Sequence, residues 1–417
     1  MFLAAWRALS GLAAAGLAAR ASVLPLRDSR RAALDQRLAR GELPPPGGLW
    51  LHAASVGEVT ALAPLVDRLR AALPPGGLFL TTSTETGRAR AAERCGAPVL
   101  LAPLDAPRVV HRFLERARPR GHVIVETELW PVRLRALARL GVPVALVSAR
   151  LSPERFPRYR RARALYGPLL RGLDLLAPAS REDAGRFLAL GARAGHLGPI
   201  GNLKWDAVPS PAPEGELEEL RESLGIARSR RWVVLGSVHP GEAAAVAAPL
   251  LARADGVPAG VLVAPRHPQR FDRLASELAA AGLSPWRASA GPAPPGTTTI
   301  LVDRMGVLAR LYGVAEAALV GGTLVPVGGH SPLEAAAAGC PQVAGPHVEH
   351  QRDLVAPLER AGALVRVTDA RHAAEVLSRW LTDPSLRDRA GRAALSEVER
   401  RRGHADRLAA CVLELLR

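Results

Sequence analysis

Short hydrophobic runs alternate with Ala-, Leu- and Arg-rich stretches along the chain from residue 48 onward. "GGLWLHAA" is followed by "EVTALAPLVDRLRAAL", and "GLFLTTST" by "TGRARAAERC". The runs "APVLLAPLD", "HVIVETE", "VPVALVSAR" and "LDLLAPAS" repeat the pattern. Short, continuously apolar runs indicate strands buried on both faces, and their alternation with helical sequence predicts a parallel, doubly wound sheet.

The alternation stops over residues 206–220, "DAVPSPAPEGELEEL", where prolines precede an acidic helix start. Such a segment is typical of an interdomain linker. Beyond it the pattern resumes with "RWVVLGSV", "GVLVAPRHP", "TTTILVD", "AALVGGTL", "PQVAGP" and "ALVRVTD". We therefore expect an α/β protein with an N-terminal segment and linker (1–47) and two Rossmann-like domains (48–210 and 211–417), with the strand carboxyl ends facing a cleft between the domains.

The N-terminal stretch "MFLAAWRALSGLAAAGLAARASVLPL" is apolar but is interrupted by Arg7. It lacks an uninterrupted span of about 20 apolar residues. The basic stretch "RDSRRAALDQRLAR" that follows suits a cytoplasmic flank, which favours a membrane anchor or an in-plane helix. The small residues of "GLAAAGLAARA" leave a cleaved signal peptide as the alternative.

Composition narrows the class of protein. Hydrophobic residues make up 48% of the 417 residues and aromatic residues 4%, which suits an α/β protein better than a sandwich or a disordered chain. The cysteines, Cys95, Cys340 and Cys411, are odd in number and lack metal-ligand spacing. They argue against a disulfide framework or a zinc site and favour a reducing compartment.

The formal charge of +16 comes almost entirely from arginine, since Lys204 is the single lysine among 55 basic residues. Such a balance predicts attraction to polyanions, either phosphate-rich membrane surfaces or nucleic acid. The densest cluster runs from Arg155 to Arg171, and it suits either a solvated face or an interfacial patch. No recognised nucleic-acid-binding motif accompanies it, and compositional drift toward arginine explains the charge.

A glycine-rich loop, "GGTLVPVGGHSPLEAAAAGC", is a candidate phosphate cradle. Gly328 and Gly329 permit an irregular backbone, and Ser331, Pro332 and Glu334 have the spacing of a helix start with a capping box. A capping box alone is common, so a purely structural role is the alternative. The P-loop motif is absent, and no G-x-G-x-x-G follows the first strand, which argues against a P-loop ATPase and weakens a dinucleotide site.

Other polar residues follow buried strands. Arg266 and His267 in "APRHPQRF" can bind phosphate or cap the next helix. Glu126 and Glu128 in "VIVETELWP" end a strand that should be buried, and a carboxylate there is costly unless it is paired or functional. Backbone hydrogen bonds to these carboxylates are the alternative explanation.

Rare residue types gather in two segments. The single lysine and the single asparagine, Lys204 and Asn202, lie in "IGNLKWD", and Met305 in "VDRMGVLARLYG" is the only methionine after the first residue. If compositional drift has replaced these types elsewhere, they persist where arginine or leucine cannot serve. For Lys204 this suggests that the position requires a compact, flexible ammonium group and not the planar guanidinium of arginine.

Glu58 follows a glycine in "WLHAASVGEV", where a hydrophobic run gives way to a helix. It is either a helix-start carboxylate or a catalytic base. The two roles are compatible, because the helix dipole favours the ionised carboxylate that a base requires. Gly57 places no side chain beside it and so leaves room for another group.

Together these stretches resemble the Kdo transferases of lipopolysaccharide synthesis, which add 3-deoxy-D-manno-octulosonic acid (Kdo) to lipid A precursors. The matching segments run in family order over residues 50–350: "LHAASVGEV", "TTSTETG", "ETELWP", "SARLS", "GNLKWD", "GSVHPGE", "PRHPQRF", "DRMGVLARLYG", "VGGTLVPVGGHSPLEAAAAG" and "GPH". The resemblance implies an inverting, metal-independent glycosyltransferase of GT-B architecture without a cofactor. Its donor would be CMP-Kdo and its acceptor would be lipid IVA. The N-terminal segment would hold the enzyme at the anionic cytoplasmic face of the inner membrane.

By motif position the resemblance makes Glu58 the general base, with Glu126 and Lys204 stabilising the transition state. Residues 48–210 would bind the acceptor and residues 211–417 the CMP-sugar. The implied CMP contacts are Pro265, Arg266, Met305, Gly306, Val307, Ser331, Pro332, Leu333 and Glu334. Two residues depart from the family pattern: Ser331 stands where asparagine is usual, and Val307, where glutamate is usual, can contribute only its backbone.

Two other functions compete with this hypothesis. One is another GT-B sugar-nucleotide enzyme, such as a UDP-sugar transferase or a non-hydrolysing epimerase, and an epimerase would not need the membrane features. The other is a nucleic-acid-binding protein, suggested by the charge alone.

Overall fold

The computed structural model describes residues 2–23, 28–253 and 256–417, and within the first helix it describes the side chains of residues 6–17 only. The predicted N-terminal segment, residues 1–47, thus lies partly outside the described residues. The chain forms two compact units, one of Met1–Ala207 with Arg402–Arg417, the other of Val208–Arg401. The boundary at 207/208 falls within the proline-rich stretch 206–220.

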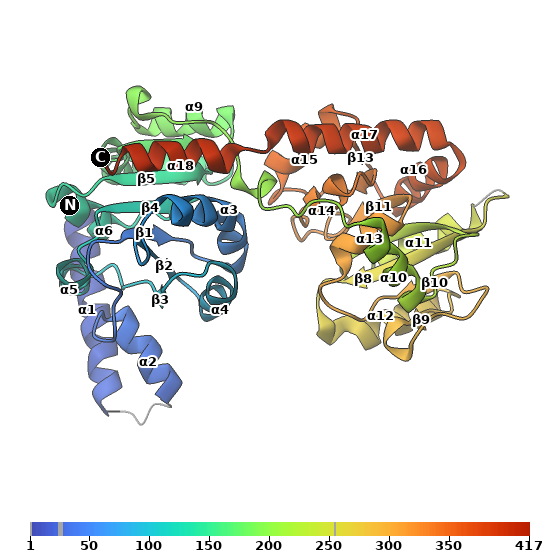
Figure 1. The fold of residues 1–417 in the computed structure, drawn as a ribbon, viewed down its shortest axis with the longest axis horizontal. Coiled ribbons are helices and arrows are strands. Elements are labelled where there is room, and N and C mark those ends of the chain that lie inside the picture. The colour runs from blue at the N-terminus through green and yellow to red at the C-terminus, as the bar shows by residue number, and fades with distance from the viewer. Residues whose placement is uncertain (1, 24–27, 254–255) are drawn as a thin grey trace. The chain divides into compact units, whose positions relative to one another are not determined.

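Six described strands of the first unit form one parallel sheet in the order β3-β2-β1-β4-β5-β6 (Figure 1). The strands are β1 (Leu49–His52), β2 (Leu78–Thr82), β3 (Val99–Leu101), β4 (Gly121–Val125), β5 (Val144–Ala149) and β6 (Leu175–Pro178). The helices are α1 (Phe2–Val23), α2 (Asp28–Arg37), α3 (Val56–Ala72), α4 (Glu85–Arg94), α5 (Pro107–Ala117), α6 (Pro131–Arg139), α7 (Phe156–Arg161), α8 (Arg163–Arg171), α9 (Arg181–Leu190) and α18 (His404–Glu414).

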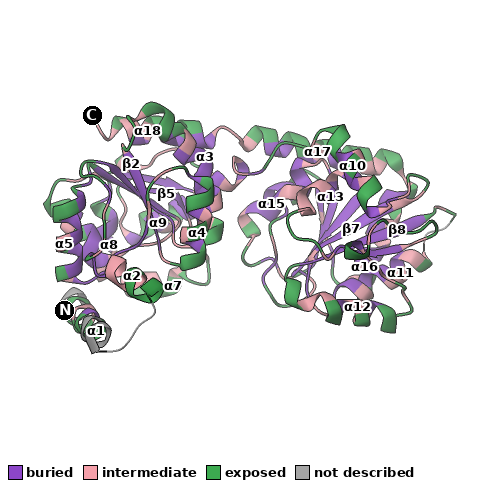
Figure 2. Ribbon diagram, turned by 60° about the horizontal axis from the view of Figure 1, so that its bottom comes forward, coloured by how far each residue is buried: buried purple, intermediate pink, exposed green. Residues whose placement is uncertain are grey.

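Residues of each strand alternate between two cores. Trp50 faces one core, together with Phe79 and Phe113, while Leu49 and Leu51 face the other. Both faces of the sheet are therefore apolar, which explains why the strand sequences are continuously hydrophobic. Figure 2 shows the strands as buried ribbons and the outer helix faces as exposed.

Seven described strands form the parallel sheet of the second unit, in the order β13-β12-β11-β7-β8-β10-β9. These are β7 (Arg231–Val238), β8 (Ala259–Pro265), β9 (Trp286–Arg287), β10 (Thr299–Leu301), β11 (Ala317–Val320), β12 (Gln342–Ala344) and β13 (Leu364–Arg366). Its helices are α10 (Glu214–Leu224), α11 (Ala243–Ala252), α12 (Phe271–Ala280), α13 (Leu308–Val314), α14 (Leu333–Ala337), α15 (Arg352–Arg360), α16 (Ala370–Thr382) and α17 (Pro384–Arg401). The short edge strand β9 was not among the predicted strands.

The predicted second domain, residues 211–417, differs from the second unit at its end. Helix α18 belongs to the first unit, where it packs against α3 (Figure 1). Leu408 and Val412 of α18 are buried in the same core as Leu62 and Leu65 of α3. The Asp206 carboxylate also accepts hydrogen bonds from the backbone N–H groups of Gly403 and Ala405 at the start of α18. Hydrophobic burial on the first sheet thus places the last residues in the first unit.

Both sheets reverse their strand order at one point. In the first unit the chain proceeds from β1 to β2 and β3 on one side, and from β4 to β5 and β6 on the other. In the second unit the corresponding junction is β7–β11. Ligands of open α/β sheets bind outside the carboxyl ends of the strands at this junction. The loops after β1, β4, β7 and β11 are therefore the places to look for chemistry.

Candidate active site

Glu58 lies in the first turn of α3, directly after β1. Its backbone N–H points to Oγ of the N-cap residue Ser55, at 3.4 Å, and the Ser55 hydroxyl in turn donates to Glu58 Oε1 at 3.2 Å. Oε2 accepts a hydrogen bond of 2.8 Å from the backbone N–H of Ala54. These bonds form a capping arrangement that begins the helix and fixes the carboxylate at the edge of the sheet.

Burial raises the pKa of Glu58 to about 7, although the hydrogen bond from Ala54 opposes the shift. The nearby carboxylates of Glu126 and Glu128 raise the pKa further. We expected the helix N-terminus to favour the ionised form; desolvation and like charges outweigh that effect here. The result is a carboxylate that changes its charge near neutral pH, as a general base does.

Glu126 follows β4 and forms ion pairs with two cations. Its Oε1 lies 3.1 Å from Nζ of Lys204 and 3.4 Å from Nη1 of Arg150. Burial alone would raise the pKa of Glu126, but the two cations outweigh it and the pKa is lowered. The structure therefore brings together Glu58, Glu126 and Lys204, all three predicted catalytic residues, and adds Arg150.

The backbone around this cluster is strained. Glu126 has a φ of 59° and Ser148, in a bulge of β5, has a φ of 47°. Non-glycine residues seldom adopt such angles, and they concentrate at functional sites. Ser148 Oγ accepts a hydrogen bond from Leu203 N–H at 3.0 Å, and the bulge thereby holds the short helical turn of residues 203–205.

Asn202 caps that turn. Its side-chain oxygen accepts a hydrogen bond of 3.0 Å from the backbone N–H of Lys204. The turn directs the Lys204 ammonium group to Glu126. The persistence of the single asparagine therefore has a physical reason, since a short amide side chain places the lysine.

Glu128 is held at the same edge by different partners. Its Oε2 accepts a hydrogen bond of 2.8 Å from Nε1 of Trp130 and lies 3.9 Å from Nε2 of His52. Burial lowers the pKa of His52 to about 4, so this histidine is neutral at pH 7 and the contact is not an ion pair.

In the second unit one buried carboxylate organises the loops at the junction. Glu242 accepts hydrogen bonds of 2.7–3.0 Å from four backbone N–H groups, those of His239, Gly322, Thr323 and Leu324. Glu242 is fully buried. It thus ties the loop after β7 to the loop after β11.

A chain of hydrogen bonds adjoins this clamp. Arg270 Nη1 lies 3.0 Å from His239 Nδ1, and His239 Nε2 lies 2.9 Å from His330 Nε2. Because a guanidinium group can only donate, His239 accepts at Nδ1 and donates from Nε2 to His330. Burial lowers the pKa of His330 to about 4, with Arg266 adding to the shift. Both imidazoles are therefore neutral at pH 7.

The predicted CMP contacts lie at the end of β8, where Pro265 is the last strand residue, and in the segments that follow β8, β10 and β11, including the start of α14. Arg266 follows β8 and is exposed, and its charge opposes the burial that raises the pKa of Glu334. Arg266 thus lies within electrostatic reach of both His330 and Glu334. Pro332 and Leu333, beside Glu334, are buried.

The predicted capping box of the β11 loop was wrong. Ser331 Oγ accepts from the N–H of Leu333 at 3.4 Å, and Pro332 occupies the N-cap position. Among the residues that the structure describes, Glu334 makes no reciprocal bond to Ser331. Helix α14 is a short helix of five residues, so its dipole contributes little to anion binding.

Met305, Gly306 and Val307 form the turn before α13. Gly306 has a φ of 81°, which glycine adopts without strain. Met305 is 55% exposed. Internal packing therefore does not explain why this methionine persists.

Sequence reasoning missed several residues at these edges. Arg150, Ser148, His239, Glu242 and His330 were not selected, although "SARLS" and "GSVHPGE" had been noted as segments. Their roles depend on bonds between loops far apart in sequence, which no local pattern shows. Within the described ranges, no group of three or more His, Cys, Asp or Glu residues could hold a metal ion; metal independence stays a prediction.

Two parallel α/β units with polar loops at the junctions define the class of protein. Residues 305–397 match the family model described as glycosyl transferases group 1, and residues 29–207 match that described as 3-deoxy-D-manno-octulosonic-acid transferase (kdotransferase). The chain is thus a glycosyltransferase of GT-B architecture.

Relatives of known function narrow the class to one family. A 3-deoxy-D-manno-octulosonic acid transferase of Bordetella pertussis is 36% identical over 87% of this chain and 85% of its own length. One of Haemophilus influenzae is 32% identical over 88% and 86%. The chain belongs to the 3-deoxy-D-manno-octulosonic acid transferase family. The recognition from sequence motifs is confirmed.

Solved structures agree in fold. UDP-GlcNAc 2-epimerase from Neisseria meningitidis has a TM-score of 0.60 and 12% identity, covering 88% of this chain and 99% of that one. Anabaena HepE bound to UDP-glucose has a TM-score of 0.60 and 16% identity, with coverages of 88% and 99%. At these identities the similarity shows the fold alone, so the epimerase function gains no support from it.

Proposed function

We propose that the protein is an inverting transferase that moves Kdo from CMP-Kdo to the lipid A precursor lipid IVA in lipopolysaccharide core biosynthesis, with Glu58 as the general base. The observation that carries this proposal is the position of Glu58. It is fixed at the β1–β4 junction, has a pKa of about 7, and lies beside the Glu126–Lys204 pair.

The reaction needs one base. The acceptor hydroxyl oxygen attacks the anomeric carbon of Kdo, the bond from that carbon to the CMP phosphate oxygen breaks, and the electron pair leaves with CMP. The acceptor proton passes to Glu58. A single displacement of this kind inverts the anomeric centre, and a base whose pKa is close to the working pH suits the proton transfer.

Glu126 and Lys204 supply charge to the same chemistry. The Kdo donor carries a carboxylate, and CMP departs with growing negative charge on its phosphate. The Lys204 ammonium can balance either charge, and Glu126 holds it in place through the 3.1 Å contact. Lys204 is half-buried, so its charge is screened less than that of a surface lysine.

CMP would be held by the loops after β8, β10 and β11. Arg266 can bind phosphate, and Met305 and Gly306 present an open turn. The Ser331 hydroxyl can donate a hydrogen bond, although its oxygen also serves the N–H of Leu333. Val307 offers only its backbone. No metal or other cofactor is part of this proposal.

Helix α1 would hold the enzyme at the anionic cytoplasmic face of the inner membrane. Leu9 and Leu12 are 67% and 71% exposed, as on a helix lying in the plane of a membrane. Among the described helices, none has the length and hydropathy to cross a bilayer. The Arg155–Arg171 cluster suits a solvated face better, because Phe156, Tyr159 and Tyr166 pack against the core.

The decisive experiment incubates the protein with CMP-Kdo and lipid IVA and weighs the lipid product by mass spectrometry. The proposal expects Kdo-bearing lipid, with the anomeric configuration opposite to that of the donor. Release of CMP without glycosylated lipid would falsify the acceptor assignment.

Glu58→Gln tests the base. The glutamine amide keeps an oxygen that can accept the hydrogen bonds at the helix start, but it cannot take a proton. Transfer should therefore fall by about 10³-fold while CMP affinity is unchanged. Ser55→Ala is the matched control, because it removes the cap and keeps the base. It should cost about 1 kcal/mol of stability and retain most of the transfer. Substantial turnover by Glu58→Gln would remove Glu58 from the mechanism.

A further inference from the structure

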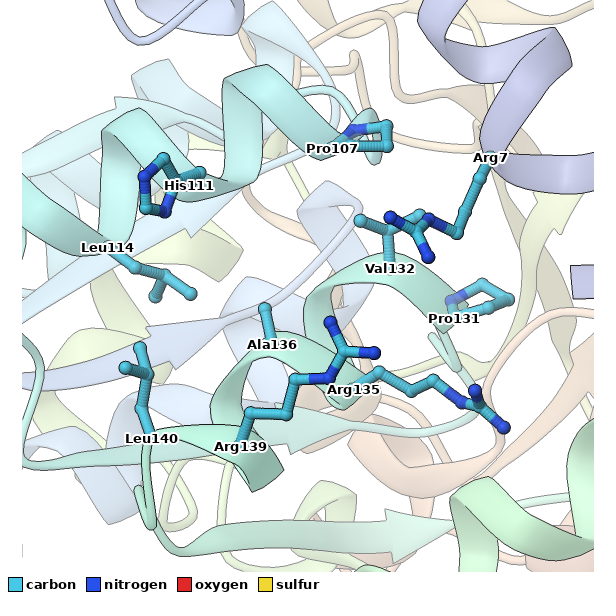
Figure 3. Close-up of a pocket in the computed structure, with 10 residues that line it drawn as sticks. All are labelled: Arg7, Pro107, His111, Leu114, Pro131, Val132, Arg135, Ala136, Arg139 and Leu140. Carbon is cyan, nitrogen blue, oxygen red and sulfur yellow. The ribbon is translucent and has the colours of Figure 1, made fainter. Parts of the chain in front are cut away.

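A pocket of about 280 Å³ lies in the first unit, where Pro131 and Val132 of its lining directly follow the loop after β4. Figure 3 shows it among α1, α5 and α6, with Arg7 on α1, His111 and Leu114 on α5, and Arg135 and Arg139 on α6. Leu114, Val132, Ala136 and Leu140 give it an apolar lining. The volume is roughly nine times that of a water molecule in the liquid, enough for a small charged group with an apolar attachment.

Three guanidinium groups in this pocket lack anionic partners. Among the described residues, Arg7, Arg135 and Arg139 make no side-chain hydrogen bond or ion pair. His111 differs, since its Nε2 lies 3.1 Å from a Glu115 carboxylate oxygen. Figure 3 shows the Arg7 and Arg139 side chains over the middle of the pocket. Like charges gathered in this way repel one another unless an anion lies among them.

Helix α1 is anchored where Arg7 can reach the pocket. Trp6 Nε1 donates a hydrogen bond of 2.8 Å to Asp105 Oδ2, and the Trp6 ring lies 6.5 Å from that of Trp130. Ala14, seven residues after Arg7, is buried in the core of the unit. Residues at this spacing share one face of a helix, so Arg7 lies on the same side of α1 as buried Ala14, although the Arg7 side chain itself is exposed.

The opposite face of α1 is apolar. Leu9 and Leu12 lie roughly 140° and roughly 160° of helical rotation from Ala14 and are exposed. A helix is about 10 Å across, while an in-plane helix sinks about 5–10 Å into the membrane boundary. With the leucines in the acyl layer, Arg7 on the inner face is therefore level with the lipid phosphates.

We propose that the pocket of Arg7, Arg135 and Arg139 binds the phosphate of an anionic phospholipid whose acyl chains run beside Leu9 and Leu12. Guanidinium groups bind phosphate in a bidentate manner, and the apolar lining suits the glycerol and first methylenes. The inference rests on the proposed membrane association but does not depend on sugar transfer. It adds a discrete lipid site to a helix that would otherwise attach through its leucines alone.

The test compares two double variants with equal loss of charge. Arg135→Gln/Arg139→Gln alters the pocket, and Arg158→Gln/Arg161→Gln alters exposed arginines of α7 in the same unit. Binding is measured by cosedimentation with phosphatidylcholine vesicles, with and without phosphatidylglycerol. Calorimetry with monomeric short-chain phosphatidylglycerol isolates the pocket from the bilayer.

The expected result is saturable one-site binding of the short-chain lipid, weakened about tenfold or more in the pocket variant and unchanged in the α7 variant. Equal losses of lipid binding in the two variants would mean that the protein binds anionic lipid by diffuse electrostatic attraction, and would overturn the assignment of the pocket. Equal binding of phosphatidylcholine would also overturn it while leaving membrane association intact. Binding of the wild type to neither vesicle would contradict the proposed localisation as well.

A final measurement separates two sources of phosphate. In nonionic micelles free of phospholipid, the pocket variant should keep the wild-type KM for the tetraacyl acceptor. A raised KM would assign the pocket to a phosphate of the acceptor and would overturn the phospholipid assignment.

Discussion

Apart from the extra edge strand β9 of the second unit, the two sheets have corresponding strand orders, but they place different polar groups at the junction where that order reverses. At β1–β4 the groups are charged side chains, with Glu58 and Glu126 beside Lys204. At β7–β11 the buried Glu242 carboxylate instead accepts hydrogen bonds from four backbone N–H groups. The first arrangement leaves a carboxylate able to change its charge, whereas the second uses its carboxylate to shape loops. The same scaffold thus holds a carboxylate with a raised pKa in one unit and a set of tied loops in the other.

Removal of Glu242 should have the largest effect on this contrast. Glu242→Ala leaves four buried N–H groups without their acceptor and should lower the free energy of unfolding by about 3 kcal/mol or more. CMP affinity should fall with it, because the β7 and β11 loops lose their connection. Denaturant unfolding and calorimetric CMP titration measure both. Glu375→Ala, in an exposed pair with Arg379, is the control and should cost at most about 0.5 kcal/mol.

Lys204→Arg tests whether charge alone suffices at the first junction. The longer planar guanidinium cannot reproduce the point contact with Glu126, and kcat should fall about 10- to 100-fold with the fold intact. Arg150→Lys is the reciprocal exchange at the same carboxylate. It should lose less, since Arg150 lies farther from Oε1. Near-normal rates for Lys204→Arg would show that the single lysine persisted by chance.

Gly57→Ala tests whether space beside Glu58 belongs to the acceptor. A Cβ at Gly57 would meet no atom within 4 Å, so the fold does not require glycine there. Alanine should raise helix stability by about 0.5–1 kcal/mol but raise the acceptor KM several-fold. Gly185→Ala in α9, with equally open surroundings, is the matched control, with the same gain and no change in KM. Unchanged kinetics in Gly57→Ala would refute the assignment.

The smallest predicted effect is a pH-dependent difference in the free energy of unfolding between Glu58→Gln and the wild type. The pKa of Glu58 is about 7 in the folded protein against an ordinary 4.5, so its favourable contribution is present at low pH and is lost as pH rises through 7. Glu58→Gln should therefore be more stable than the wild type at pH 8, by about 1 kcal/mol, and nearly equal at pH 5. Denaturant unfolding at both pH values checks this, and a pH-independent difference would contradict the raised pKa.

Hydrophobic patterning predicted the two parallel sheets because strands buried on both faces leave a continuous apolar signal. A position at the end of a buried strand drew attention to Glu126, a helix start to Glu58 and residue rarity to Lys204, whereas the roles of Glu126 and Lys204 came from the family resemblance. The clamp at Glu242 was missed because its four partners lie up to 82 positions away. The prediction of a capping box at Ser331 was wrong although the sequence has the pattern of one. Hydrogen bonds from other loops constrain the loop after β11, and a local pattern does not show them.

Helix α18 has a consequence for the order in which the chain folds. Residues Val208–Arg401 form a continuous unit that can fold while synthesis continues. The first unit exposes the α3 face of its core until Leu408 and Val412 pack against it. Because these residues follow the whole second unit in the sequence, residues 1–207 keep apolar surface uncovered until the second unit has been synthesised. Deletion of α18 should therefore yield a first unit prone to aggregation, even though the second unit is intact.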